Sequence, residues 1–129
     1  MAKVIGLGGV FFRSEDPAAL RAWYGEHLGM PVTEYGASFL PKALPSSGYQ
    51  LWSPFVKDSE YLGGPNQSYM INLMVDDLAG CLQAVTKGGA KDVRGPDVSE
   101  YGAFGWFEDP DGNRIELWQP ASELPGDVK

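Results

Sequence analysis

The chain contains one pattern of residues twice, and this repeat constrains its fold more than any other feature. Residues 10–32 align with residues 71–93 at a shift of 61 positions, and residues 50–54 align with residues 116–120 at a shift of 66. Insertions are best tolerated in loops, so the difference of five is expected between matched elements. Each half is therefore expected to form the same supersecondary unit, and the two units to stack.

The first unit, about residues 3–56, reads as strand, helix and three further strands. Asp16 is a typical N-cap, Pro17 suits a first helical turn, and Gly29 suits a helix end. Between them, apolar residues recur at helical spacing. The strands are predicted at residues 4–13, 30–35, 38–40 and 48–54.

The second unit, about residues 68–120, repeats this order. Asp77 is predicted to cap a helix that ends near Gly88. The segment DPDGN at residues 109–113 combines Asp-Gly with proline, which indicates a tight hairpin turn. Strands are predicted at residues 68–75, 91–98, 103–108 and 114–119, the second of them at a sheet edge because it contains proline.

Neither unit can bury the open face of its own sheet, so we expect a single α+β domain over residues 1–129. It would consist of two tandem βαβββ modules around a cleft, followed by a frayed tail at residues 121–129. The length of 129 residues suits one hydrophobic core.

The formal net charge of −7 disfavours nucleic acid as a partner, because like charges repel. It suits a cationic small molecule or serves solubility alone. The glycine-containing amino terminus does not resemble a membrane helix, so no membrane partner is expected. The single cysteine excludes an internal disulfide, and a cytoplasmic location is expected.

The segments EDPAALRAWYGEHLGMPV and WFEDPDGNRIELWQP resemble the vicinal oxygen chelate superfamily. That group includes glyoxalase I, extradiol dioxygenases, and fosfomycin- and bleomycin-resistance proteins. The resemblance extends to about Pro120 and implies the paired-module fold and a homodimer. It does not assign a reaction, because one fold supports several chemistries.

Metal-using members of this superfamily take one ligand from the first strand and one from the last strand of each module. The equivalent positions here are Gly9, Gln50, Met70 and Glu116. Glycine has no side chain and a thioether binds hard divalent ions poorly, so one amide and one carboxylate remain. We therefore expect no cofactor and no divalent metal, and neither glyoxalase I nor extradiol dioxygenase activity.

Strand alternation from these four positions predicts the wall of a small-molecule pocket. Glu116 is the candidate acid–base residue, with a purely structural hydrogen bond to Gln50 as the alternative. Tyr101, Phe104 and Trp106 are predicted to form a lid. The complete set of candidate ligand-binding residues is Phe11, Arg13, Gln50, Trp52, Met70, Asn72, Tyr101, Trp106 and Trp118, with Met74 beside them.

Two further residues are interpreted as structural. His27, the only histidine, lies late in the first predicted helix and away from the four ligand-equivalent positions. Cys81 lies on the apolar side of the second helix and is expected to pack in the core.

Three functional hypotheses follow from these residues and from the resemblance. The first is a glyoxalase-related protein that binds a small organic molecule in an aromatic cleft, or an enzyme that acts on it through Glu116. The second is a binding-only protein that sequesters a drug, as bleomycin-resistance proteins do. The third is a metal-dependent lyase or dioxygenase with altered ligands.

Overall fold

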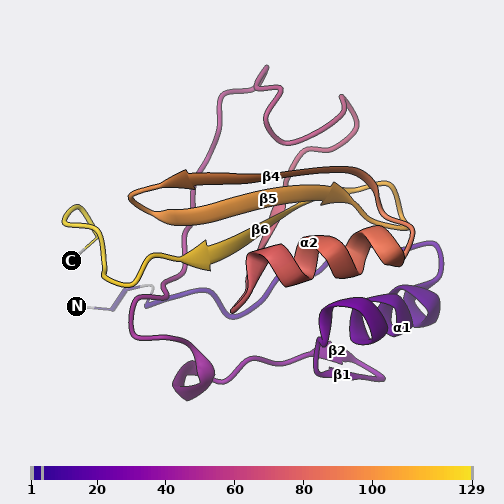
Figure 1. Ribbon diagram of the computed structural model, residues 1–129, viewed down its shortest axis with the longest axis horizontal. Helices are drawn as coiled ribbons and strands as arrows, with labels where there is room; N and C mark the ends of the chain where they lie inside the picture. The colour runs from indigo at the N-terminus through magenta and orange to yellow at the C-terminus, as the bar shows by residue number, and fades with distance from the viewer. Residues whose placement is uncertain (1, 4, 129) are drawn as a thin grey trace.

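The computed structural model describes residues 2–3 and 5–128 as an α+β protein (Figure 1). Within these residues no helix combines the length and the apolar character that a membrane span requires. The elements, in chain order, are α1 (Pro17–Leu28), β1 (Val32–Thr33), β2 (Gly36–Ala37), a 3-10 turn (Pro41–Ala43), β3 (Ile71–Met74), α2 (Leu78–Lys87), β4 (Lys91–Ser99), β5 (Gly102–Glu108) and β6 (Arg114–Pro120).

The second half forms the βαβββ unit that the sequence predicts. Its four strands lie in the order β3-β6-β5-β4, with β3 parallel to β6 and the other pairs antiparallel. The proline-containing strand β4 is at one edge, as expected, and β3 is at the other.

The predicted turn at residues 109–113 joins β5 to β6. The backbone N–H of Gly112 donates to the Asp109 carbonyl at 2.8 Å, and Asp109 N–H donates to the Asn113 carbonyl at 2.9 Å. Gly112 has φ +83°, a conformation that a residue with a side chain rarely adopts. The side chain of Asp109 also accepts from the backbone N–H of Asp111 and Asn113, each at 3.0 Å.

Both helices begin and end where their capping residues predict. Asp16 accepts a hydrogen bond from Ala19 N–H and Asp77 accepts one from Gly80 N–H, both at 3.1 Å. Helix α1 ends at Gly29, which has φ +61°.

One hydrophobic core joins α1, α2 and one face of the sheet. The hydroxyl of Tyr24 in α1 donates to Asp109 in the β5–β6 turn at 2.9 Å, and Trp23 Nε1 donates to the Gly88 carbonyl at 2.8 Å. These bonds fasten the helix of the first half to the second half. The buried members of the core are Leu20, Tyr24, Leu78, Leu82, Val85, Phe107, Ile115 and Leu117.

The first half forms less sheet than predicted. The strands expected at residues 4–13 and 48–54 are not strands within the described residues, so both predictions were wrong; Val4 lies outside those residues. The strand predicted at 30–35 is reduced to β1, and β2 lies just before the strand predicted at 38–40.

The physical reason lies between these segments. Pro41 and Pro45 lack the N–H that a strand ladder needs, and the chain turns there instead of pairing. No hairpin therefore forms before residue 48, and apolar side chains in residues 4–13 and 48–54 remain exposed, as in Phe11 and Trp52.

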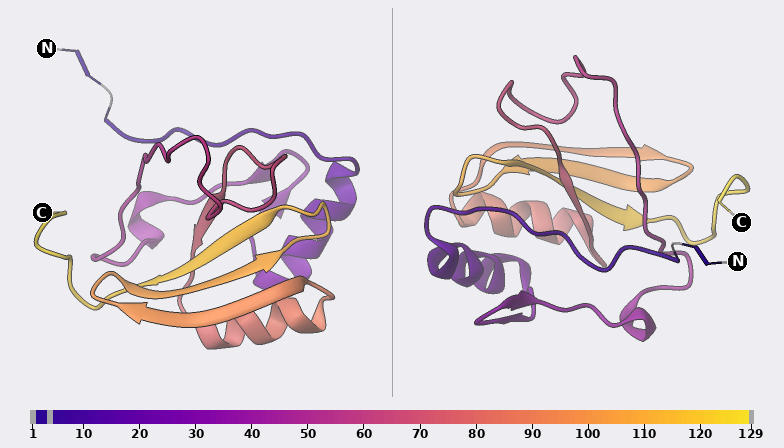
Figure 2. Two further views of the ribbon diagram at one scale, coloured as in Figure 1. Left: turned by 90° about the horizontal axis from the view of Figure 1, so that it is seen from above. Right: turned by 180° about the vertical axis from the view of Figure 1, so that it is seen from behind.

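The sheet of the second half has two unlike faces. Helix α2 covers one face, and the linking segment between the halves, residues 57–67, passes over the other, as the left panel of Figure 2 shows. We call this second side the open face. Strand alternation directs Ile115 and Leu117 toward α2, and Glu116 and Trp118 to the open face.

Candidate functional site

Glu116 lies at the centre of the open face, on the strand flanked by both β3 and β5. Its register partners are Asn72 on β3 and Trp106 on β5. Only 8% of Glu116 is exposed. Carboxylates are seldom this buried unless their oxygens are hydrogen-bonded or paired with a cation.

Three side chains donate hydrogen bonds to this carboxylate. Asn72 Nδ2 donates to Oε1 at 2.7 Å, and Trp106 Nε1 donates to Oε2 at 2.9 Å. The hydroxyl of Tyr61, from the segment between the halves, also donates to Oε2. All three donors are neutral, so they hold the charge without cancelling it.

No cation neutralises Glu116 among residues 2–3 and 5–128, where the ion pairs involve Glu26 and Asp92 instead. The surroundings also act on Tyr61: burial, followed by the hydrogen bond to Glu116, raises the pKa of its hydroxyl to about 12. The site therefore favours a protonated donor facing Glu116.

Aromatic rings surround the carboxylate. Tyr61 stacks on Phe55 with centroids 5.7 Å apart and meets Trp106 edge-on at 6.2 Å. Further along β6, Trp118 lies parallel to Phe104 at 6.3 Å. A few polar groups among aromatic walls are typical of small-molecule sites.

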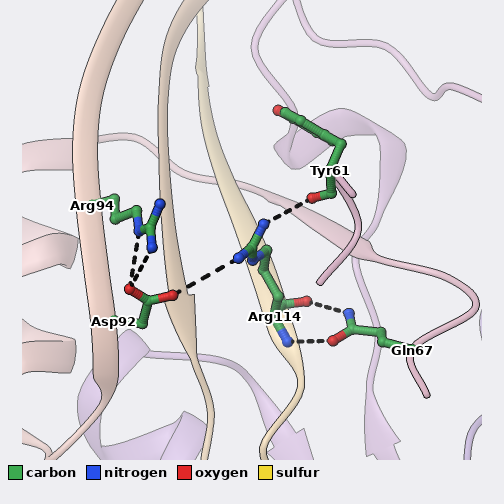
Figure 3. A network of polar contacts seen from close by, with 5 residues as sticks. All are labelled: Tyr61, Gln67, Asp92, Arg94 and Arg114. Carbon is green, nitrogen blue, oxygen red and sulfur yellow. Dashed lines mark hydrogen bonds and ion pairs between the residues drawn. The ribbon is translucent and has the colours of Figure 1, made fainter. Parts of the chain in front are cut away.

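A polar network fastens the Tyr61 backbone to the sheet (Figure 3). Arg114 Nη1 donates to the Tyr61 carbonyl at 3.1 Å, and Asp92 lies 3.8 Å from Nη2 of the same guanidinium. The Gln67 side-chain amide accepts a hydrogen bond from the Arg114 N–H at 2.7 Å and donates one to the Arg114 carbonyl at 2.8 Å. A polar hollow of about 60 Å³ adjoins this network.

A larger depression, of about 530 Å³, lies on the other side of the sheet between α2 and β4. It is broadly open to solvent, and Lys87 is its only charged lining residue. The convergent polar groups lie around Glu116, so we assign the candidate site to the open face.

The structure brings together part of the predicted residue set. Asn72, Trp106, Glu116 and Trp118 share the open face, and Trp118 Nε1 donates to the Tyr101 carbonyl at 2.8 Å. The Tyr101 hydroxyl bonds Asp127 instead of facing Glu116. Their part in ligand binding stays a prediction.

Within the described residues, the predicted residues of the first half donate no hydrogen bond to Glu116. Phe11 is 96% and Trp52 is 80% exposed, and Arg13 is also exposed. Gln50 is exposed and accepts from Leu7 N–H at 2.8 Å, so the predicted alternative of a Gln50–Glu116 hydrogen bond was wrong. Met70 is half-buried just before β3.

Tyr61 and Phe55 are the site residues that sequence reasoning missed. Tyr61 lies in the linking segment and Phe55 just after the repeated residues 50–54, so the internal repeat covers neither of them. The available signal was one tyrosine within a segment rich in glycine, proline and polar residues, with Phe55 shortly before it.

The donors at the metal-equivalent positions do not fit a divalent ion. Gly9 supplies no donor, Gln50 Oε1 accepts from Leu7, and both oxygens of Glu116 accept from their own neighbours. No group of three or more His, Cys, Asp or Glu side chains in the described chain is placed to hold a metal. That the protein uses no divalent metal stays a prediction.

His27 and Cys81 lie outside the candidate site. His27 packs against the Trp23 ring at 5.2 Å. Cys81 is half-buried on α2, and burial raises the pKa of its thiol, which disfavours the reactive thiolate.

Comparison with known proteins gives one family and a distant structural likeness. The family model described as "Glyoxalase-like domain" matches residues 9–118. The crystal structure of TnmS3, an antibiotic binding protein from Streptomyces sp. CB03234, is similar over 83% of this chain and 88% of that chain, at 20% identity and a TM-score of 0.47. No curated protein matches the chain.

Proposed function

The chain belongs to the glyoxalase-like domain family, and from this premise we propose that it binds a small organic molecule on its open face. The observation that carries the proposal is the environment of Glu116. Glu116 is 8% exposed, and its carboxylate faces aromatic rings and has no cationic partner within the described residues. A ligand that donates to this carboxylate would gain a charge-assisted hydrogen bond.

Binding without a metal is the form of the function that the donor set supports best. Asn72 and Trp106 direct N–H groups at Glu116, and these groups carry no lone pair for an ion. We expect no chelator-sensitive turnover of methylglyoxal with glutathione. Turnover of that kind would restore the hypothesis of a metal-dependent lyase.

Acid–base chemistry by Glu116 is the second candidate within this proposal. Oxygen Oε2 accepts two hydrogen bonds and Oε1 accepts one, so proton transfer would need a donor to move away first. Of these three donors to Glu116, Tyr61 alone comes from outside the sheet. Sequestration without turnover would leave the bound molecule chemically unchanged, which mass spectrometry after incubation would detect.

Ligand titration tests the proposal directly. Tryptophan fluorescence would be followed during addition of a panel of small aromatic, cationic and anionic compounds, including a cationic glycopeptide. Binding should weaken at least tenfold in Glu116→Gln, because the charge is lost while the shape is retained. Glu123→Gln, which makes the same change at an exposed tail position, is the matched control. Equal affinities in both variants would reject the site.

We also propose that the chain forms a homodimer through residues 5–12 and 51–56. Both segments expose large apolar side chains, among them Ile5 at 92%, Phe11 at 96% and Trp52 at 80%. Aromatic side chains bury roughly 150–250 Å² each, so the two segments together approach the roughly 800 Å² per partner of a standard interface. A second copy is favoured as the occupant because it offers an equally apolar surface.

The oligomeric state tests this second proposal. Sedimentation velocity should give a dimer for the natural chain and a monomer for Phe11→Asp. Val98→Asp places the same charge at another exposed apolar residue, on β4, and should remain dimeric. A monomeric natural chain at micromolar concentration would contradict the proposal.

A further inference from the structure

We propose that the ligand of the open face is a planar aromatic ring carrying a hydrogen-bond donor, and that it takes the position of the Tyr61 side chain. This inference rests on the proposed function and names its ligand class. The Tyr61 phenol is itself such a group: its ring pairs with those of Phe55 and Trp106, and its hydroxyl donates to Glu116.

The ring position is defined on two sides. Phe55 lies nearly parallel to Tyr61, at an interplanar angle of 15°, and Trp106 meets it at 88°. Stacked and edge-on arrangements are the two that aromatic pairs prefer. A flat ring fits this space, whereas an aliphatic chain would lose both interactions.

The Tyr61 side chain can leave without disturbing the sheet. Tyr61 is 41% exposed, and its carbonyl, not its ring, is held by Arg114 (Figure 3). A change of side-chain rotamer would free the ring position while the backbone stays attached. Asn72 and Trp106, in contrast, project from paired strands and remain beside Glu116.

The chemistry at Glu116 requires a donor. When Tyr61 moves away, Oε2 keeps only the Trp106 N–H, and an acceptor brought there would meet a carboxylate oxygen. A phenol restores the lost hydrogen bond. A protonated amine restores it and also supplies the cation that Glu116 lacks among the described residues.

Tyr61→Ala and 4-methylphenol, which is the tyrosine side chain itself, test the inference. Calorimetry should show that the variant binds 4-methylphenol about tenfold or more tightly than the natural chain does, because no internal phenol competes. Tyr61→Phe keeps a ring in place and should bind no better than the natural chain. Toluene, which lacks the donor, should bind Tyr61→Ala about tenfold or more weakly than 4-methylphenol.

A second probe separates the two kinds of donor. At neutral pH 4-methylbenzylamine is a cation, and tighter binding than 4-methylphenol would identify a protonated amine as the preferred donor. The reverse order would identify a neutral hydroxyl. Either order supports the shared class, whereas equal binding of toluene overturns the requirement for a donor.

A measurement on the natural chain removes any dependence on the folding of the variant. In protein labelled with ¹³Cζ-tyrosine, saturating 4-methylphenol should shift the Tyr61 resonance, assigned with Tyr61→Phe, and leave the other five tyrosines nearly unchanged. An unmoved Tyr61 resonance overturns the displacement. If no aromatic donor binds Tyr61→Ala while another compound binds the natural chain in a Glu116-dependent manner, the ligand class fails and the proposed function stands.

Discussion

The two halves of the chain share a repeated sequence pattern but differ in how much sheet they form. Within residues 2–3 and 5–128, the second half has four hydrogen-bonded strands and the first has one pair of two-residue strands. Their helices, in contrast, are capped alike by Asp16 and Asp77. The difference shows that helices, whose signals are local, follow the repeat more faithfully than strands, which need a partner.

The connection between strands accounts for the difference. In the second half, residues 109–113 close a hairpin through backbone bonds and Gly112. In the first half, the equivalent stretch contains Pro41 and Pro45 and forms a 3-10 turn. Unless a turn brings a second strand alongside, the backbone N–H and C=O groups of a segment cannot pair as in a sheet.

The largest expected effect is on stability, and it compares a buried phenylalanine of the second half with an exposed one of the first. Phe107→Ala removes a side chain that is 1% exposed and should lower the free energy of unfolding by about 3–5 kcal/mol. Phe11→Ala, the same change in the first half, should cost under about 0.5 kcal/mol in dilute, monomeric protein. Urea denaturation followed by circular dichroism measures both. Similar losses would mean that the first half packs as tightly as the second.

The next prediction concerns the hydrogen bond from Tyr24 in the first half to Asp109 in the second. Asp109→Ala leaves the buried Tyr24 hydroxyl and two turn N–H groups without their acceptor, and should cost about 2–3 kcal/mol. Tyr24→Phe removes one of these bonds and should cost about 1 kcal/mol. Thermal and urea unfolding check both values. An unchanged free energy of unfolding in Asp109→Ala would show that α1 does not depend on this turn.

A smaller effect tests the turn itself. Gly112→Ala introduces a side chain at φ +83° and should cost about 1 kcal/mol, with little steric conflict because only Glu108 lies within 4 Å of the new Cβ. Gly64→Ala, in the linking segment, meets nothing within 4 Å and should change stability by less than about 0.5 kcal/mol. If both substitutions are equally mild, hairpin geometry does not explain the contrast.

The smallest effect concerns ionisation of Tyr61, which links the segment between the halves to the sheet. Its pKa of about 12 in the folded protein exceeds the ordinary 10.0, so its contribution to stability is complete below pH 10 and is lost as the pH rises through 12. Glu116→Gln should move this pKa part of the way toward 10, because burial is the larger cause. Phenolate absorbance, corrected with Tyr61→Phe, measures it. An unchanged titration would mean that the bond to Glu116 is not made in solution.

Much of the second half could be predicted because its signals are local or alternate strictly. Asp77, the DPDGN turn and the apolar alternation around Glu116 place the helix, the hairpin and the two faces of β6. The same alternation places Asn72 and Trp106 on the open face, although their binding role stays a prediction.

The remaining features depend on contacts that no local pattern encodes. The apolar stretch around Phe11 has strand composition, but its exposure depends on whether another strand lies beside it. Tyr61 reaches Glu116 because Arg114 and Gln67 fix the linking segment, a set of contacts spanning about half the chain. No periodic pattern in the sequence predicts either the exposure of Phe11 or the contact between Tyr61 and Glu116.

Strand β6 has a consequence for how this protein can diverge. Ile115 and Leu117 belong to the core beside α2, whereas Glu116 and Trp118, at the intervening positions, belong to the open face. Mutations at alternate positions of one strand therefore fall under different selective constraints. Descendants of this chain can acquire new recognition properties at Glu116 and Trp118 while inheriting the residues that maintain the folded scaffold.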